Sequence, residues 1–293
     1  MNDRPKITQA MINLYDEYTH LTLDRRAFMD KLGRLTGSAA VAAAIAPLLS
    51  ANQAQAAIVP ADDKRVVALR IQYPGAAGGF MKGYLVVPAG VSGPFPAVIV
   101  VHENRGLNAH IEDVARRVAL EGFLALAPDF LSPAGGTPTD EDQARTLISA
   151  LDPAQTVQSA VATVDYLRTD TKRTTGKVGA IGFCWGGGVV NQLAVASPDL
   201  MADVSYYGMQ PTAGIGQIKA HLLLHYAGLD DRTNAGIKDF EAALKAAGVD
   251  YKTYLYEGAN HAFNNDTSEA RYDKKAADLA WSRTTAFLKE TLG

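Results

Sequence analysis

The stretch KVGAIGFCWGGGVVNQLAV, residues 177–195, decides the fold of this chain. It begins as an apolar run typical of a buried strand, turns through Gly182-Phe183-Cys184-Trp185-Gly186, and continues with the apolar spacing of a helix. The only cysteine of the chain stands at the turn. Cys184 could be a buried packing residue, part of a glycine-rich phosphate loop, or a nucleophile.

The glycine spacing disfavours both common phosphate-binding motifs. A dinucleotide fingerprint needs G-x-G-x-x-G after the first strand, but these glycines follow the pattern G-x-x-x-G-G-G late in the chain. A P-loop needs a lysine before serine or threonine at the start of the helix, where Val189-Val190 stand instead. The packing interpretation stays open, because most lone cysteines are small buried hydrophobes.

The pattern G-x-C-x-G matches the nucleophile elbow G-x-S-x-G, with a thiol in place of the hydroxyl. It lies between a strand and a helix, which is the context that this motif requires. The backbone of the nucleophile is strained there, so Gly182 and Gly186 let the strand and the helix pass closely. The positive end of the helix also favours a thiolate. The elbow is therefore the favoured interpretation of Cys184.

An elbow predicts an acid and then a histidine later in the chain, each in a loop that follows a strand. The strand-like run AHLLLHYAG is followed by Leu229-Asp230-Asp231, and the run VDYKTYLYEG is followed by Ala259-Asn260-His261. We therefore expect Cys184, Asp230 and His261 to form a catalytic triad. Asp231 is the alternative acid, and we expect it instead to cap a helix or to be exposed.

Strand-like runs alternate with helical patterns along most of the chain. The runs occupy residues 64–74, 79–90, 95–103, 123–130, 177–183, 201–208, 220–228 and 249–258. This alternation predicts an α/β fold with a mostly parallel sheet and helices on both faces. The first two runs flank a Gly-rich turn and predict a hairpin. The length that remains suits one such domain without a large cap.

The composition excludes several classes of function. The chain has 293 residues, 20% of them charged, and a formal net charge of −3, so nothing favours a nucleic-acid partner. A single cysteine allows no intramolecular disulfide and no cysteine-rich zinc site. The proposed triad itself needs no metal and no organic cofactor.

The motifs GFCWGGG, GLDD and GANHAF, with VVHENRGLN upstream, resemble those of the dienelactone hydrolases, a branch of the α/β-hydrolases with a Cys-His-Asp triad. The resemblance covers roughly residues 65–293. It implies an eight-stranded sheet and a carboxymethylenebutenolidase-like reaction on a small-molecule ester or lactone. In that reaction Cys184 would form a thioester intermediate.

The resemblance also implies further site residues. Glu103 matches a family glutamate that interacts with the cysteine in the resting enzyme and helps to form the thiolate when substrate displaces it. The alternative is that Glu103 simply pairs with Arg105. The oxyanion hole is expected to use the backbone N–H groups of Trp185 and Asn104.

One position departs from the family pattern. Dienelactone hydrolase anchors its substrate's carboxylate with arginines, one of them four residues after the catalytic histidine, where this chain has Asn265. Arg105, Arg232 and Arg271 are the candidates to supply that charge. The alternatives for function are a carboxylesterase or thioesterase on another acyl substrate, or a non-hydrolytic thiol redox or binding protein on the same fold.

The first 56 residues resemble an export signal. Arg25-Arg26 with Phe28 precede an apolar stretch at about 35–49 and the small-residue pattern Ala54-Gln55-Ala56. A twin arginine is typical of the Tat pathway, which exports folded proteins. We therefore expect contact with the Tat export machinery, cleavage near Ala56/Ala57, and a periplasmic hydrolase domain at 57–293 with no stable membrane span.

The alternative is a cytoplasmic protein that keeps an amphipathic N-terminal helix. The unusually long lead-in of residues 1–24 leaves this alternative open. His20 falls in this segment, so the sequence does not place it in the site.

Overall fold

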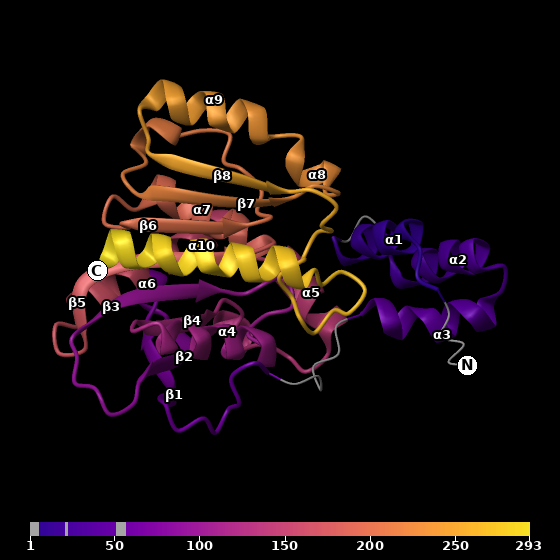
Figure 1. Ribbon diagram of the computed structural model, residues 1–293. Coiled ribbons are helices and arrows are strands. Elements are labelled where there is room, and N and C mark those ends of the chain that lie inside the picture. Colours follow the sequence, from indigo (N-terminus) through magenta and orange to yellow (C-terminus); the bar gives the residue numbers. More distant parts are fainter. Residues whose placement is uncertain (1–5, 21–22, 51–56) are drawn as a thin grey trace.

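The computed structural model describes residues 6–20, 23–50 and 57–293. An eight-stranded sheet in the order β1-β2-β4-β3-β5-β6-β7-β8 forms its centre (Figure 1). Strand β2 runs antiparallel to both of its neighbours, and the pairs from β4 to β8 are all parallel. The predicted α/β fold with a mostly parallel, eight-stranded sheet is confirmed. The strands are β1 (Val66–Pro74), β2 (Phe80–Pro88), β3 (Phe95–Val101), β4 (Leu124–Asp129), β5 (Thr174–Phe183), β6 (Ala202–Tyr206), β7 (His221–Ala227) and β8 (Tyr251–Tyr256).

Helices cover both faces of the sheet. One apolar core contains the inward side chains of α4 and α10, and the other contains those of α6, α7 and α9. In β3, Val98 and Val100 face the first core while Ile99 and Val101 face the second, as the continuous apolar run predicts. The helices of the described residues are α1 (Gln9–Thr19), α2 (Arg25–Thr36), α3 (Ala39–Leu49), α4 (Ala109–Leu120), α5 (Glu141–Ser149), α6 (Pro153–Thr169), α7 (Trp185–Ala196), α8 (Asp231–Asn234), α9 (Ile237–Ala247) and α10 (Lys274–Leu292), with short 3-10 turns η1 (Ala76–Gly78), η2 (Ser132–Ala134) and η3 (Ile215–Gln217).

Helices α1–α3 form a small bundle with an apolar core of its own. Side chains at their starts cap the helices, because Thr8, Asp24 and Ser38 each accept a hydrogen bond from a backbone N–H of the first turn. The core contains Leu14 and Leu32, among others. The bundle lies beside the edge of the sheet toward which the arrowheads of β3, β7 and β8 point (Figure 1). It therefore stands next to the carboxyl ends of the parallel strands, where α/β folds place their sites.

The expected export signal coincides with this bundle, although its proposed cleavage pattern, Ala54-Gln55-Ala56, lies outside the described residues. Among the described helices, none alone has the length and apolar character to cross a membrane; α2 and α3 meet that standard only when taken together, and they are bent by 112° at their junction. The division into a signal at 1–56 and a hydrolase domain at 57–293 stays a prediction.

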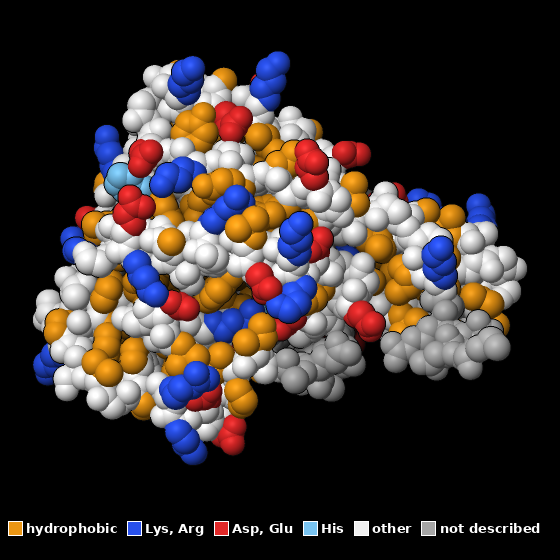
Figure 2. Space-filling model, viewed as in Figure 1, with side chains coloured by type: hydrophobic (Ala, Val, Ile, Leu, Met, Phe, Trp, Pro, Cys, Tyr) orange, Lys and Arg blue, Asp and Glu red, His pale blue; other side chains and the backbone are white. Residues whose placement is uncertain are grey.

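The surface carries mixed charge. In the space-filling view, lysine and arginine side chains are interspersed with aspartate and glutamate over the face shown (Figure 2). That face offers no basic stripe of the kind that follows a nucleic-acid backbone.

Candidate active site

The elbow at Cys184 joins β5 to α7. Cys184 has φ 55° and ψ −115°, a conformation that costs energy for a residue with a side chain. A Cβ on Gly182 would lie 2.1 Å from the carbonyl oxygen of Gly186, and one on Gly186 would lie 2.4 Å from that of His102. Both glycines are therefore required for strand and helix to approach, and the tight turn holds the sulfur at the carboxyl end of β5.

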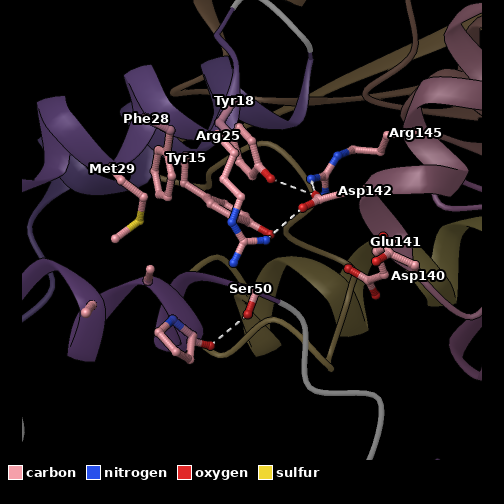
Figure 3. Close-up of a pocket in the computed structure, with 13 residues that line it drawn as sticks. Tyr15, Tyr18, Arg25, Phe28, Met29, Ser50, Asp140, Glu141, Asp142 and Arg145 are labelled. Atoms are coloured by element: carbon pink, nitrogen blue, oxygen red, sulfur yellow. Dashed lines mark hydrogen bonds and ion pairs between the residues drawn. The ribbon is translucent and has the colours of Figure 1, made fainter.

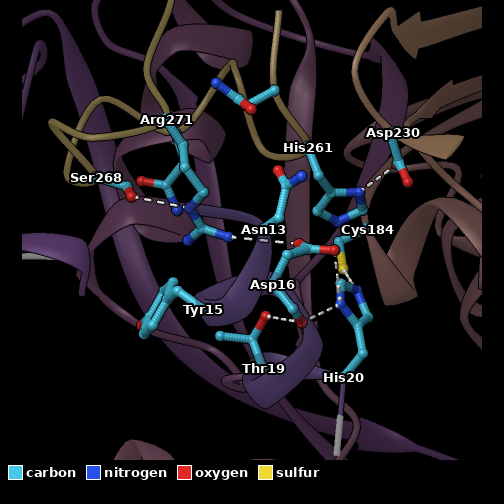
Figure 4. A network of polar contacts seen from close by, with 12 residues as sticks. Asn13, Tyr15, Asp16, Thr19, His20, Cys184, Asp230, His261, Ser268 and Arg271 are labelled. Carbon is cyan, nitrogen blue, oxygen red and sulfur yellow. Dashed lines mark hydrogen bonds and ion pairs between the residues drawn. The ribbon is translucent and has the colours of Figure 1, made fainter. Parts of the chain in front are cut away.

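Asp230 and His261 lie together beside the elbow. Asp230 caps α8 after β7, and its Oδ2 atom lies 2.5 Å from Nδ1 of His261, which follows β8 (Figure 4). The other Asp230 oxygen accepts the backbone N–H of Thr233 at 3.1 Å, which fixes the carboxylate. Asp231 is the first residue of α8 and is exposed. The structure thus brings Asp230, rather than Asp231, to the imidazole.

With Nδ1 of His261 bound by Asp230, the other ring nitrogen, Nε2, is available to the Cys184 thiol. This Nε2 atom is buried and has no hydrogen-bond partner among the described residues. One ligand atom each from His20, Cys184 and His261 lies within 4.8 Å of the other two. Imidazole and thiolate donors of this kind suit Zn²⁺, so these three side chains form a possible metal site within the part of the chain that the structure describes.

Charges at the site favour a thiolate beside an imidazolium. Burial raises the pKa of Cys184, but His261 and then His20 outweigh it and lower that pKa to about 6. Burial lowers the pKa of His261, yet Cys184, Asp16 and Asp230 together raise it well above its ordinary value. Asp230 is also buried, which raises its pKa, but His261 and Thr233 bring it down to about 2.

Glu103 is buried near the sulfur but bonds elsewhere. Glu103 and Cys184 line the same small cavity. The Oε2 atom of Glu103 accepts a hydrogen bond of 2.8 Å from Nδ2 of Asn265. Burial raises the pKa of Glu103, but His110, Arg105 and Arg271 hold it below its ordinary value. The hydrogen bond drawn to the sulfur comes from His20 instead (Figure 4).

The two expected oxyanion donors belong to residues that line the same pocket as Cys184. Trp185 is the first residue of α7, so its N–H has no partner within the helix. Its indole stacks on His102 at 5.2 Å between ring centres. Asn104 lies in the loop after β3, and its side chain donates to the carbonyl oxygen of Thr19 at 2.6 Å.

A pocket of about 370 Å³ opens beside Cys184, a volume suited to a small molecule. Of the three arginines considered for substrate binding, Arg232 is exposed and lines this pocket. Arg105 is buried and donates to the Tyr15 hydroxyl, and Arg271 is buried beside Asp16. Asn265, which occupies the family's arginine position, is 1% exposed and holds Glu103.

Residues 81–292 match the model of the Dienelactone hydrolase family. The chain belongs to that family. It is therefore an enzyme of the ester- and lactone-hydrolase class, built on the α/β-hydrolase-like fold. Helices α1–α3 precede the matched residues.

Relatives in the dienelactone hydrolase family match most of the chain. A "Putative carboxymethylenebutenolidase" of Escherichia coli O157:H7 is 33% identical over 256 residues, covering 82% of this chain and 93% of that protein. The structure of a "Putative Dienelactone Hydrolase" from Klebsiella pneumoniae is 28% identical with a TM-score of 0.68, covering 77% of this chain and 99% of that one. A dienelactone hydrolase-like promiscuous phosphotriesterase from metagenomic libraries is also 28% identical, with a TM-score of 0.69, over 78% of this chain and all of that one.

This dienelactone hydrolase family member has one site residue that the sequence interpretation left out. Nε2 of His20 lies 3.5 Å from the sulfur of Cys184 and 2.8 Å from an Arg232 nitrogen. The sequence placed His20 in the export signal. Two features of the sequence could have indicated it. Residues 1–24 form a long segment before Arg25, and Asp16 and His20 are four positions apart, which places both on one face of a helix.

The N-terminal bundle also meets the family domain at a second pocket, of about 470 Å³, between α1–α3 and α5 (Figure 3). The hydroxyl of Tyr18 donates to Asp142 at 2.6 Å, and Arg25 contacts the same carboxylate at 2.9 Å. Arg145 lies over the Tyr18 ring, 4.6 Å from its centre, and pairs with Asp142. These contacts hold the bundle against the rest of the protein.

Proposed function

We propose that this protein hydrolyses an ester or lactone through a thioester on Cys184, with His261 as the base and Asp230 as its partner. One observation carries the proposal: a buried imidazole whose Nδ1 is held by Asp230 at 2.5 Å keeps a free nitrogen beside a thiol on a strained elbow. This is the arrangement that activates a nucleophile by an oriented base.

In the first half of the reaction, the Cys184 proton already lies on Nε2 of His261, and the thiolate attacks the carbonyl carbon. The carbonyl π electrons move to its oxygen, where the N–H groups of Trp185 and Asn104 stabilise the negative charge. The intermediate then collapses, the carbon–oxygen single bond breaks, and His261 returns the proton to the leaving alkoxide. In a lactone that alkoxide stays attached to the acyl group.

In the second half, water attacks the thioester carbon while His261 accepts a proton from the water. Collapse of the second intermediate breaks the carbon–sulfur bond, regenerates the thiolate and releases the carboxylic acid. Asp230 stays ionised and stabilises the imidazolium in both halves. Glu103 assists thiolate formation in this proposal when a bound substrate changes the surroundings of the sulfur.

The substrate proposal is a small ester or lactone of the dienelactone type. The carboxymethylenebutenolidase name of the relatives and the 370 Å³ pocket at Cys184 support it. Arg232 is the exposed arginine in this pocket, so it can reach a substrate carboxylate there, whereas Arg145, which also lines the pocket, is buried. Arg105 and Arg271 are buried against α1.

The test is acylation of Cys184, the only cysteine in the chain. We expect incubation with a panel of short esters and lactones to add the acyl mass to Cys184, and Cys184→Ala to abolish both the adduct and turnover. Unchanged turnover in Cys184→Ala would refute the nucleophile. Peroxide-sensitive labelling of Cys184, with no adduct from any ester, would favour the thiol redox alternative.

Location is a separate proposal. The twin arginine Arg25-Arg26 supports export to the periplasm through the Tat machinery with cleavage near Ala56/Ala57, and retention in the cytoplasm is the alternative. Sequencing the N-terminus of the protein recovered from periplasmic and cytoplasmic fractions separates the two. A start near Ala57 supports cleavage, and a start at Met1 refutes it.

A further inference from the structure

Helix α1 ends inside the candidate active site, although it precedes the residues of the family match. Its last residue, Thr19, and the next one, His20, both line the pocket at Cys184. Thr19 accepts a hydrogen bond through its carbonyl oxygen from the side chain of Asn104 at 2.6 Å. His20 reaches the sulfur itself at 3.5 Å. Two consecutive residues of the bundle therefore contact two parts of the proposed reaction centre.

The His20 ring is held in the same way as the ring of His261. Its Nδ1 atom lies 2.8 Å from the backbone oxygen of Asp16 and 3.3 Å from an Asp16 carboxylate oxygen. With Nδ1 occupied, Nε2 is the nitrogen that faces the sulfur. The rings of His20 and His261 meet edge to face, 4.9 Å apart. Two aspartate-backed imidazoles thus converge on one thiol (Figure 4).

We propose that His20 is a catalytic residue of this enzyme, which stabilises the Cys184 thiolate alongside His261, and that α1 stays with the working protein. The proposal rests on the proposed function, because it assigns a role within the Cys184 reaction. Thr19 adds a positioning role, since its carbonyl holds the Asn104 side chain and with it the loop that carries the second oxyanion donor.

The charges around His20 agree with this role. Burial lowers the pKa of His20, but the Cys184 thiolate and Asp16 raise it to about 9. Asp16 on its own helix, Cys184, His261 and Arg232 face it, with Arg271 beside Asp16. Glu103, Arg105 and Arg145 line the two cavities that His20 also lines. Arg232 and His261 oppose a positive charge on His20, whereas Asp16 and the thiolate favour it. Arg232 can only donate to Nε2 of His20, so His20 donates from Nε2 to the sulfur when it is protonated and that contact with Arg232 is released.

The bundle forms a wall of the site without filling it. The 370 Å³ pocket remains open beside Cys184, with Thr19 and His20 among its lining residues. A segment that blocked the site would occupy that space. Cleavage near Ala56 would remove this wall together with His20, so this inference takes the alternative in which the N-terminal segment is retained.

The experiment measures the pH dependence of Cys184 alkylation in the full-length chain. Because the chain has one cysteine, the rate of iodoacetamide alkylation reports the Cys184 thiolate alone. The wild type should reach half of its maximal rate near pH 6. In His20→Ala the midpoint should rise by about one pH unit or more, since an opposite charge near the sulfur has been removed. At pH 6.5 the alkylation rate should fall by roughly threefold or more.

Three further variants separate a chemical role from a structural one. Asp16→Asn should shift the midpoint in the same direction by a smaller amount, because His20 loses its carboxylate. Tyr18→Phe removes a docking hydrogen bond of α1 at Asp142 but leaves His20 in place, so it should not shift the midpoint. His221→Ala removes an exposed histidine paired with Asp250 at the start of β7, the end of the strand away from the site, and should match the wild type.

The outcomes distinguish this inference from the proposed function. If the wild type forms the acyl adduct but His20→Ala keeps the wild-type midpoint and acylation rate, the role of His20 is refuted while the hydrolase proposal stands. If Tyr18→Phe shifts the midpoint as far as His20→Ala does, the effect is structural and the role is again refuted. If the wild type forms no adduct, the proposed function fails, and with it the catalytic part of this inference.

Retention of the N-terminal segment has its own test, the intact mass of the protein from its native host. If the only active species lacks the first 56 residues, the proposal that α1 stays with the working protein is refuted.

Discussion

Cys184 lies close to two histidines that are each held by an aspartate. His261 and Asp230 come from loops at the carboxyl ends of β8 and β7, and His20 and Asp16 come from α1. Burial of the thiol opposes ionisation, yet the two imidazoles together lower its pKa to about 6. The sulfur is therefore largely a thiolate at neutral pH in a side chain that is only 8% exposed.

This electrostatic balance predicts the acid limb of the pH profile. Because the pKa of Cys184 is lowered to about 6, kcat/KM should rise as the pH increases through about 6 and should be lost below it, where the thiolate becomes protonated. The measurement is kcat/KM for one neutral ester from about pH 4.5 to about pH 8. A midpoint near the ordinary thiol pKa would contradict the proposed stabilisation of the thiolate.

The two neighbouring aspartates provide a matched pair of variants. Asp230→Asn should lower kcat by about 10³- to 10⁴-fold, because an amide cannot orient and stabilise the imidazolium of His261 in the same way. Asp231→Asn should leave kcat nearly unchanged, since Asp231 is exposed on α8. Steady-state kinetics of both variants test the assignment, and an equal loss in the two would contradict it.

At the scale of elements, the turn between β5 and α7 determines where the sulfur can stand. The first turn of α7 passes so close to β3 that the Cα of Gly186 points at the backbone of Val101 and His102. A side chain there meets carbonyl oxygens of the main chain, which cannot move aside as a flexible side chain could. Backbone packing therefore requires glycine at position 186, whichever residue at position 184 acts as the nucleophile.

Gly186→Ala tests that requirement. Its Cβ would lie 2.4 Å from the His102 carbonyl oxygen, so the variant should lower the free energy of unfolding by about 2 kcal/mol or more. Gly216→Ala in η3 is the control, because nothing lies within 4 Å of a Cβ there, and it should change stability by no more than about 0.5 kcal/mol. Thermal and denaturant unfolding measure both, and equal stability of the two variants would contradict the packing argument.

At the scale of the whole molecule, the pocket at Cys184 is assembled from segments far apart in the chain. It is lined by the end of α1, by α5, α6 and α7, and by Arg232 of α8. In the proposed reaction at Cys184, substrate specificity would therefore depend on how the N-terminal bundle and the helices at the carboxyl ends of the strands meet. Arg232 is the cationic side chain that is both exposed and close to His20 there.

Arg232→Gln tests the anchoring of an anionic substrate. We expect KM for an ester that carries a carboxylate to rise by about tenfold, which corresponds to the loss of one charge-assisted hydrogen bond, while KM for its neutral analogue changes little. Arg168→Gln, which removes a surface arginine paired with Asp199, is the control. An equal rise for the charged and neutral esters would show that Arg232 shapes the pocket without recognising a carboxylate.

The sequence by itself determined the alternation of strands and helices and the elbow, because each depends on local spacing. Apolar runs specify buried strands, and glycines two residues on either side of Cys184 specify the sharp turn. The order of Cys184, Asp230 and His261 also predicted which loops carry the proposed triad. Only the tertiary structure decided which of the two aspartates faces the imidazole, since Asp230 and Asp231 differ by one position and the start of α8 turns one inward and the other outward.

The tertiary structure alone also brought His20 to the sulfur and gave Asn265 its place. His20 and Cys184 are 164 residues apart, and no local pattern links them. Asn265 interrupts the family's arginine pattern, but only its buried contact with Glu103 explains what it does here. Local spacing encodes elements and turns, whereas contacts between distant side chains depend on how the elements pack, and the surroundings of Cys184 are made of such contacts.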